Sequence, residues 1–92
     1  MLYKALKSVR KFHRMSVNEF AQEIGVSPSY ISEIENNKKR IHNDILDAYS
    51  RVFDMPISSF YLIAESEQGD RPTLNAKIRR KVSKIIHWIA AD

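Results

Sequence analysis

The stretch 18–38, NEFAQEIGVSPSYISEIENNK, decides the fold because two short helical patterns flank a single glycine within it. Ser16, followed three residues later by Glu19, forms a capping-box pattern, which predicts a helix over 17–24. Gly25 then ends this helix, because glycine is common just past a helix C-terminus. The chain is therefore expected to turn sharply at Gly25 and to continue in a new direction.

A second helix is predicted directly after that turn. Ser27 is a favourable capping residue, and Pro28 suits the first helical position. Ile31 and Ile34 share one face of this helix, which ends near Asn36, and small polar side chains occupy the other face. Two short helices around a tight turn form a helix-turn-helix, in which the second helix presents its polar face outward.

Helical periodicity continues on both sides of this motif. The other predicted helices run over 2–13, from a cap at Asn43 to Phe53, over 58–64 and over 74–90. Residues 66–72 are polar and contain both glycine and proline, so they predict a linker. The fold class is therefore all-α. A domain of five compact helices is expected over 1–65, and a linker with an amphipathic C-terminal helix over 66–92.

The net charge changes sign along the chain. Residues 1–43 carry eight Lys and Arg against four Glu, a net +4, and residues 44–72 carry two against six acids, a net −4. Residues 73–92 carry five against one, a net +4. A basic face and a separate acidic body suit a polyanionic partner. Charge alone does not identify such a partner, because many small basic domains bind no nucleic acid.

The sequence contains no recognisable pattern of catalytic or metal-binding residues. The absence of cysteine excludes disulfides, zinc fingers and thiol catalysis. His13, His42 and His87 lack metal-ligand spacing, and no nucleophile elbow or glycine-rich phosphate loop occurs. No apolar run approaches the roughly 20 residues that span a bilayer. We expect a cytoplasmic protein that is not an enzyme, needs no cofactor or metal and does not bind membranes.

The helix-turn-helix resembles the phage-repressor/Cro-like (Xre-type) transcriptional regulators. The similarity runs through residues 19–27, EFAQEIGVS, and residues 30–36, YISEIEN, and its most specific part is Ile-Ser-x-Ile-Glu-Asn before a basic loop. It covers about residues 2–64 and leaves the C-terminal helix outside. The resemblance implies a five-helix, lambda-repressor-like domain whose helix after Ser27 reads the major groove of double-stranded operator DNA.

The resemblance also implies which residues contact DNA. Base edges would be contacted from the start of the reading helix, by Ser27, Pro28, Ser29, Ser32 and Glu33, and the nearby Tyr30 would stack or bind a phosphate. Phosphates would be held at the start of the preceding helix, by Ser16, Val17 or Asn18, and in the basic loop, by Asn36, Asn37, Lys38, Lys39 and Arg40. Arg10 and Glu35 occupy positions that form a structural ion pair in some relatives.

Several of these residues have a plainer interpretation. Glu33 is suited to accept a hydrogen bond from cytosine N4, but it is equally suited to be a solvated acid that repels phosphate. Ser29 and Ser32 would otherwise be exposed polar residues without a contact to DNA. Tyr30 would otherwise pack its ring against a neighbouring helix.

Two positions depart from the family's pattern. Pro28 replaces a frequent polar base-reading residue, so its expected role is to start the helix. Asn37 replaces a common glycine in the loop, and asparagine tolerates the left-handed conformation better than most residues.

An apolar seam is predicted along the C-terminal helix, because Leu74, Ile78, Val82, Ile85 and Ile89 recur at helical spacing. Such a seam must be covered by the chain's own domain, by a second copy or by a different protein. We expect self-association, because a symmetric helix-turn-helix dimer reads two half-sites about 34 Å apart, one turn of the duplex.

These observations predict a homodimeric repressor that reads a (pseudo)palindromic operator with the helix beginning at Ser27. Two alternatives remain open at this stage. One is an autorepressing antitoxin whose C-terminal segment binds a toxin. The other is a protein–protein adaptor that keeps this fold without binding DNA.

Overall fold

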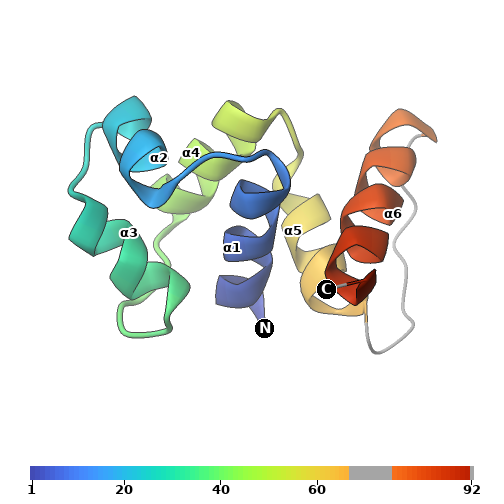
Figure 1. Ribbon diagram of the computed structural model, residues 1–92, viewed down its shortest axis with the longest axis horizontal. Helices are drawn as coiled ribbons and strands as arrows, with labels where there is room; N and C mark the ends of the chain where they lie inside the picture. Colours follow the sequence, from blue (N-terminus) through green and yellow to red (C-terminus); the bar gives the residue numbers. More distant parts are fainter. Residues whose placement is uncertain (67–75, 92) are drawn as a thin grey trace.

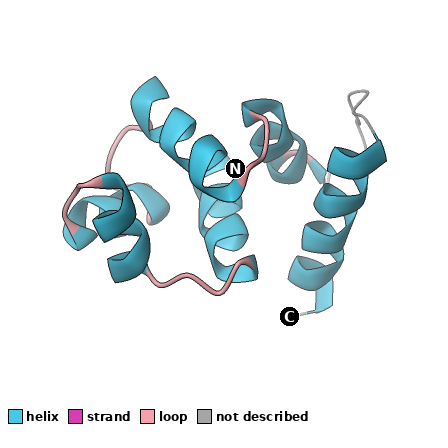
Figure 2. Cartoon of the chain, turned by 90° about the horizontal axis from the view of Figure 1, so that it is seen from above, coloured by secondary structure: helices cyan, strands magenta, loops and turns pink. Residues whose placement is uncertain are grey.

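The computed structural model describes residues 1–66 and 76–91, and all regular secondary structure in these two ranges is helical. The helices are α1 (Leu2–Phe12), α2 (Val17–Ile24), α3 (Pro28–Glu35), α4 (Asn43–Phe53), α5 (Ile57–Ala64) and α6 (Ala76–Ala91). Figures 1 and 2 show α2 and α3 at one end of the long axis, α6 at the other, and α1, α4 and α5 between them. The predicted all-α fold of five helices with an added C-terminal helix is confirmed.

The local signals around the first turn act as the sequence predicts. The Ser16 hydroxyl accepts a hydrogen bond from the Glu19 amide at 3.0 Å, and the Glu19 carboxylate accepts one from the Ser16 amide at 2.9 Å. The hydrogen bond from the Ser16 backbone amide to the carboxylate lowers the pKa of Glu19, and the Ser16 side chain lowers it further. Gly25 ends α2 in the left-handed conformation with φ 77°, which glycine adopts without a Cβ penalty.

Two helix starts differ from the prediction by one residue. Asn43, predicted as a cap, is the first residue of α4, because the extended backbone ends one residue earlier, at His42. α5 starts at Ile57 rather than at residue 58, directly after Pro56, which occupies the N-cap position. The predicted start of the last helix, with Leu74, lies outside the described residues.

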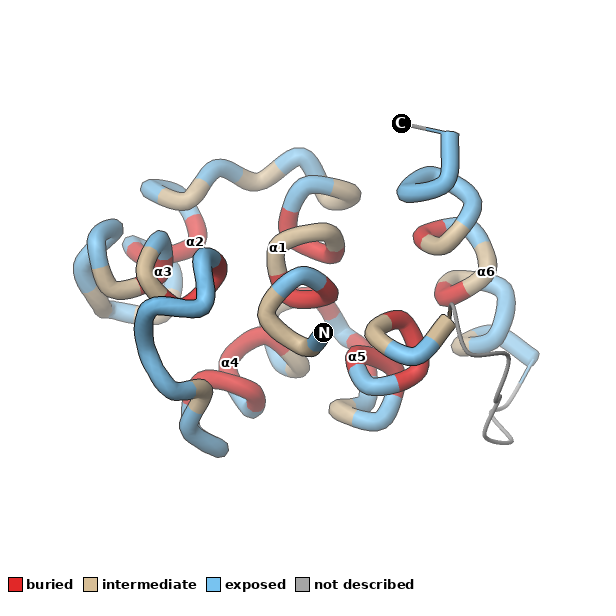
Figure 3. The backbone as a smooth tube through the Cα atoms, turned by 90° about the horizontal axis from the view of Figure 1, so that it is seen from below, coloured by how far each residue is buried: buried red, intermediate tan, exposed pale blue. Residues whose placement is uncertain are grey.

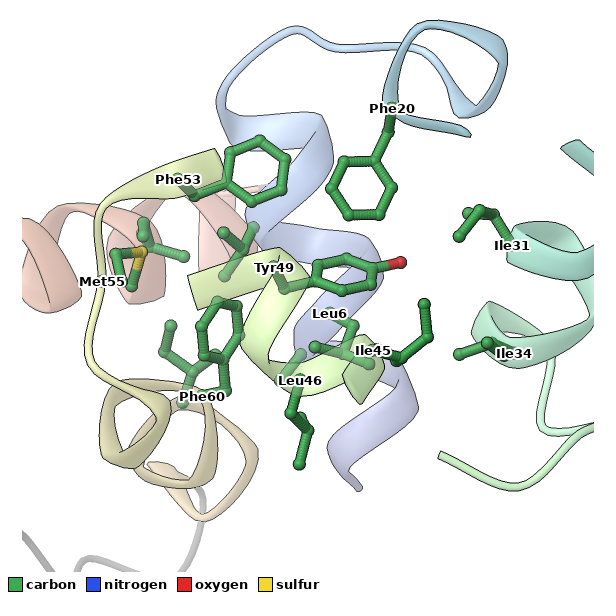
Figure 4. Packing of buried hydrophobic residues seen from close by; sticks show 14 of the residues in the cluster. Leu6, Phe20, Ile31, Ile34, Ile45, Leu46, Tyr49, Phe53, Met55 and Phe60 are labelled. Atoms are coloured by element: carbon green, nitrogen blue, oxygen red, sulfur yellow. The ribbon is translucent and has the colours of Figure 1, made fainter. Parts of the chain in front are cut away.

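A hydrophobic core extends across the described helices, with buried side chains contributed by each of α1 to α6. Aromatic rings occupy its centre, where Phe20 lies 4.2 Å from Tyr49 and 5.4 Å from Phe53 between ring centroids. Figure 4 shows that the Tyr49 ring lies among these side chains with its oxygen directed toward α3. Because residues from distant parts of the sequence interlock here, the core fixes how the helix-turn-helix is oriented.

α6 belongs to this core. It packs against α1 and α5, and its side chains Val82 and Ile85 are only 2% and 0% exposed (Figure 3). The Lys81 ammonium donates a hydrogen bond to the carbonyl oxygen of Phe53, the last residue of α4, at 2.7 Å. The apolar seam predicted to meet a second copy therefore covers the chain's own helices at Val82 and Ile85, which corrects the dimer assignment of those two residues.

Aromatic side chains extend the contacts of the C-terminal end of α1 with α6 and with α4. Trp88 meets the Phe12 ring edge-on with a centroid distance of 5.9 Å, and the His13 ring lies 4.7 Å from that of Phe53. Burial lowers the pKa of His13, the hydrogen bond to the Val9 carbonyl partly offsets this, and the nearby positive charge of Lys81 lowers it further. The imidazole thus packs at the end of α1 as a mainly neutral ring at neutral pH.

This packing predicts unequal effects of two isoleucine truncations on α6. Ile85→Ala is expected to lower the free energy of unfolding by about 2–4 kcal/mol, because it leaves a cavity in the core. Ile89→Ala is expected to cost less than about 1 kcal/mol, because Ile89 is 38% exposed. Urea denaturation followed by circular dichroism measures both losses, and two equally small losses would show that α6 does not pack on α1 and α5.

Candidate nucleic-acid interface

The two helices of the helix-turn-helix are held together by a short turn and a small buried residue. The carbonyl oxygen of Ala21 accepts hydrogen bonds from the amides of Gly25 and Val26, at 2.9 and 3.0 Å. The Ala21 side chain is fully buried, and it lets α2 and α3 approach closely. On α3, Ile31 and Ile34 are 0% exposed. One side of α3 therefore faces the core, and the other side is left for a ligand.

The N-terminal end of α3 presents small polar groups to solvent. The Ser27 hydroxyl oxygen caps the helix by accepting a hydrogen bond from the Tyr30 amide at 3.1 Å, and Pro28 occupies the first turn. Ser27, Pro28, Ser29 and Ser32 are all exposed. Amides at the start of a helix and the positive end of its dipole favour a nearby phosphate. This end of α3 therefore combines side-chain hydroxyls with an intrinsic preference for anions.

The loop after α3 folds back against the helix. The Asn36 side chain donates a hydrogen bond to the Ser32 carbonyl oxygen at 2.7 Å, and the Lys38 amide donates one to the Glu33 carbonyl oxygen at 2.8 Å. Asn37 has φ 61°, which is the left-handed conformation. This fits a position where the family commonly has glycine, because asparagine tolerates that conformation better than most residues. Residues 36–40 are all exposed. The three basic residues at 38–40 therefore lie on the surface beside the C-terminal end of α3.

Lys39 links this loop to the exposed side of α3. Its ammonium lies 3.9 Å from the Glu33 carboxylate and 5.4 Å from the centre of the Tyr30 ring. Tyr30 is half-buried and also packs against the edge of the core, so the packing interpretation holds for part of its ring. The three side chains, together with Ser27 and Ser29, line an open hollow of about 470 Å³. An ammonium group, a carboxylate and several hydroxyl groups thus lie together at one place on the surface.

A buried polar network fixes the C-terminal end of α3. Arg10 donates hydrogen bonds to the Glu35 carboxylate from Nε at 3.0 Å and from Nη2 at 2.9 Å, and it donates from Nη1 to the Met15 carbonyl oxygen at 2.8 Å. The Tyr49 hydroxyl donates to Glu35 Oε2 at 2.5 Å, and Arg10 Nε also donates to that oxygen, at 3.0 Å. Burial raises the pKa of Tyr49, and the Glu35 charge and hydrogen bond raise it further. The network therefore joins α1, α3 and α4.

Tyr49 is the member of this network that sequence reasoning missed. Its position in a helical apolar pattern indicates a core residue, which it is, but no spacing rule shows that its hydroxyl reaches a carboxylate fourteen positions away. Ser16 and Asn18, predicted to hold a phosphate, are exposed at the start of α2, and the hydroxyl oxygen of Ser16 is already used in the capping box. Arg40 is exposed in the basic loop.

Neither a metal site nor a membrane-spanning helix occurs among the described residues. Among residues 1–66 and 76–91, no group of three or more His, Asp and Glu side chains is placed to hold a metal ion. None of the helices in these ranges combines the length and the apolar character that crossing a membrane requires.

The fold and the exposed side of α3 define a DNA-binding regulator of the helix-turn-helix class. The family model described as helix-turn-helix (HTH_3) matches residues 6–60, which extend from α1 into α5. Neither the curated proteins nor the solved structures give a match to the chain. Because the family match covers more than half of the sequence, the chain belongs to this family, the Xre/Cro/C1-type helix-turn-helix regulators. α6 lies beyond the matched residues.

The buried network predicts a large loss of stability when its carboxylate is removed. Glu35→Gln is expected to lower the free energy of unfolding by about 3 kcal/mol, because the Arg10 guanidinium is left buried without its counter-charge. Tyr49→Phe is expected to cost about 1–2 kcal/mol, because Glu35 Oε2 loses the shorter of its two hydrogen bonds. Guanidinium chloride denaturation measures both values.

The control for this experiment removes the whole network. Replacing Arg10 by Met, Glu35 by Leu and Tyr49 by Phe together is expected to recover much of the loss, because no charge is then left without a partner. A loss below about 1 kcal/mol for Glu35→Gln would contradict a structural role of the ion pair.

Proposed function

We propose that the protein is a sequence-specific regulator of transcription that inserts the N-terminal half of α3 into the major groove of double-stranded DNA. The observation that supports this is the two-sided character of α3. Ile31 and Ile34 anchor one side fully in the core, while Ser29 and Ser32 are exposed on the other. A helix held from behind in this way can enter a groove without exposing apolar surface.

The roles of the surrounding residues follow from their positions. Ser29, Ser32 and Glu33 would contact base edges, and the start of α3 would approach a phosphate through the Ser29 amide and the positive end of the helix dipole. Lys38, Lys39 and Arg40 would contact the backbone beside the reading helix. The ion pair with Lys39 compensates the charge of Glu33, so this carboxylate can lie close to DNA and accept a hydrogen bond from cytosine.

We further propose that the regulator binds as a homodimer and represses the promoter that it covers. A helix of eight residues reads few base pairs alone, and two copies related by a two-fold axis double the sequence read. Because Val82 and Ile85 are buried within the chain, a contact through α6 would use its exposed apolar residues, Trp88 at 39% and Ile89 at 38%. Such a dimer would block access of polymerase to the same DNA.

The shape of the chain bears on the spacing of the half-sites. The longest dimension is 33 Å, with α3 and α6 at opposite ends. Two copies joined end to end at α6 would hold their α3 helices up to twice this length apart, about 66 Å, whereas two turns of the duplex are roughly 68 Å. A dimer joined end to end at α6 would therefore reach a spacing of up to about two turns, longer than the single turn expected from the family resemblance.

Selection of bound fragments from random duplexes tests the proposed function. We expect an inverted repeat whose half-site centres lie about 20 base pairs apart. An inverted repeat spaced by about 10 base pairs would keep the two-fold symmetry but would contradict end-to-end pairing through α6. Failure to enrich any sequence, with no salt-sensitive complex in a mobility-shift assay, would instead favour an adaptor on the same fold.

Removing two cations from the basic loop is expected to weaken DNA binding on every sequence. Lys38→Ala combined with Lys39→Ala should reduce the slope of log K against log salt by about 1.8, because two phosphate contacts are lost. Arg80→Ala with Lys84→Ala removes the same charge from α6, at the opposite end of the chain, and should leave the slope unchanged. Fluorescence anisotropy at several salt concentrations measures both slopes, and equal slopes for the two variants would refute contacts from the loop.

A further inference from the structure

A basic groove lies between α6 and the corner that joins α4 to α5. It is open along one side, has a volume of about 750 Å³, and its apolar lining includes Phe12, Met55 and Ile78. Its basic lining comes entirely from α6 and consists of Lys77, Arg80, Lys81 and Lys84. Because α6 lies outside the residues matched by the family, this groove is a feature that α6 adds to the helix-turn-helix domain.

The charge of the groove is not balanced within it. Four cations face one acid, Asp54, so the lining carries a net charge of +3. Lys81 is engaged with the Phe53 carbonyl oxygen, whereas Lys77, Arg80 and Lys84 are exposed.

The spacing of these cations makes the imbalance unfavourable for α6 itself. Lys77 and Lys81 are four positions apart, and so are Arg80 and Lys84, a spacing at which like charges repel and destabilise a helix. Residues 76–91 contain five cations and no acid, so α6 has no carboxylate of its own to relieve this repulsion. An anionic ligand would remove it.

The geometry favours a protein segment over the other anions that would satisfy this charge. Small-molecule sites enclose most of their ligand, but this groove is open. A duplex bound at α3 would lie at the other end of the chain from α6. A row of cations spaced by three and four residues above an apolar floor matches the acidic and apolar faces of an amphipathic helix.

We propose that this groove binds an acidic amphipathic segment of a partner protein. Carboxylates of the partner would pair with Lys77, Arg80 and Lys84, and its apolar side chains would pack on Phe12 and Ile78. The assignment goes beyond DNA binding, since none of these residues lies on α2, α3 or the basic loop. It gives the regulator a second surface, through which a protein can bind while α3 remains free.

The test uses the full chain and a synthetic, fluorescein-labelled peptide of the same length as α6, with Glu along one helical face and Leu along the other. Anisotropy should show saturable binding with a Kd on the order of 100 μM, weakened by salt. A peptide with Gln in place of every Glu should bind the unchanged chain about tenfold more weakly. The Glu peptide should bind the Lys77→Glu, Arg80→Glu chain with a similar loss of affinity. The milder Lys77→Gln, Arg80→Gln chain should show an intermediate loss.

A matched control separates the groove from overall charge. Lys4→Glu with Arg51→Glu makes the same change in net charge at exposed positions that do not line the groove, and it should keep the wild-type affinity for the peptide. Equal weakening by this control, no saturable binding, or equal binding of the Gln peptide would each overturn the proposal.

Two further measurements distinguish other occupants. The Lys77→Glu, Arg80→Glu chain is the groove variant in these measurements. If it lost affinity for duplex DNA as strongly as the Lys38→Ala, Lys39→Ala variant, the row of cations would be a DNA contact and the proposal would fail. If sedimentation equilibrium showed that the groove variant loses a dimer formed by the wild type, the occupant would be a second copy, and the proposal would fail as well. Unchanged duplex affinity and unchanged mass would support it and would also show that the variant is folded.

Discussion

The orientation of α3 about its own axis is the constraint on which the rest of the interface depends. Ile31 and Ile34 are fully buried, and at the end of the helix Glu35 receives hydrogen bonds from Arg10 and Tyr49. A buried carboxylate is stable only with such partners, so α3 cannot rotate without breaking the ion pair. The polar face that begins at Ser29 is therefore held outward by packing on one side and by a charge network at one end.

The same network sets the relation of α3 to the rest of the domain. Arg10 also donates a hydrogen bond to the Met15 carbonyl oxygen, in the loop before α2, while Tyr49 extends from α4. One guanidinium thus connects α1, the loop before α2 and α3. Since the Phe20 ring on α2 packs against the Tyr49 ring at a tilt, the aromatic core and the polar network share a side chain. Helices that are separate in sequence are in this way fixed relative to one another.

Features determined within a few residues could be predicted from the residues themselves. Contacts across the fold could not, except for the Arg10–Glu35 ion pair, which the family resemblance implied. The capping box at Ser16, the turn at Gly25 and the proline start at Pro28 each depend on neighbours within four positions, so their spacing was sufficient. The Tyr49 hydroxyl and the docking of α6 depend on partners that only the tertiary structure brings near. An apolar seam shows that something must cover it, but it does not show that α1 and α5 do so at Ile85.

The way in which α6 is attached to the domain offsets the repulsion among its positive charges. Like charges four residues apart weaken a helix, and α6 compensates by burying Val82 and Ile85 and by the Lys81 hydrogen bond to the end of α4. Lysine near a helix C-terminus also interacts favourably with the dipole of that helix, so Lys81 stabilises α4 while anchoring α6. Packing and capping thus explain the buried side of α6 and one of its cations. They do not explain the exposed cations in the row, such as Arg80, whose mutual repulsion would be relieved by an external anion.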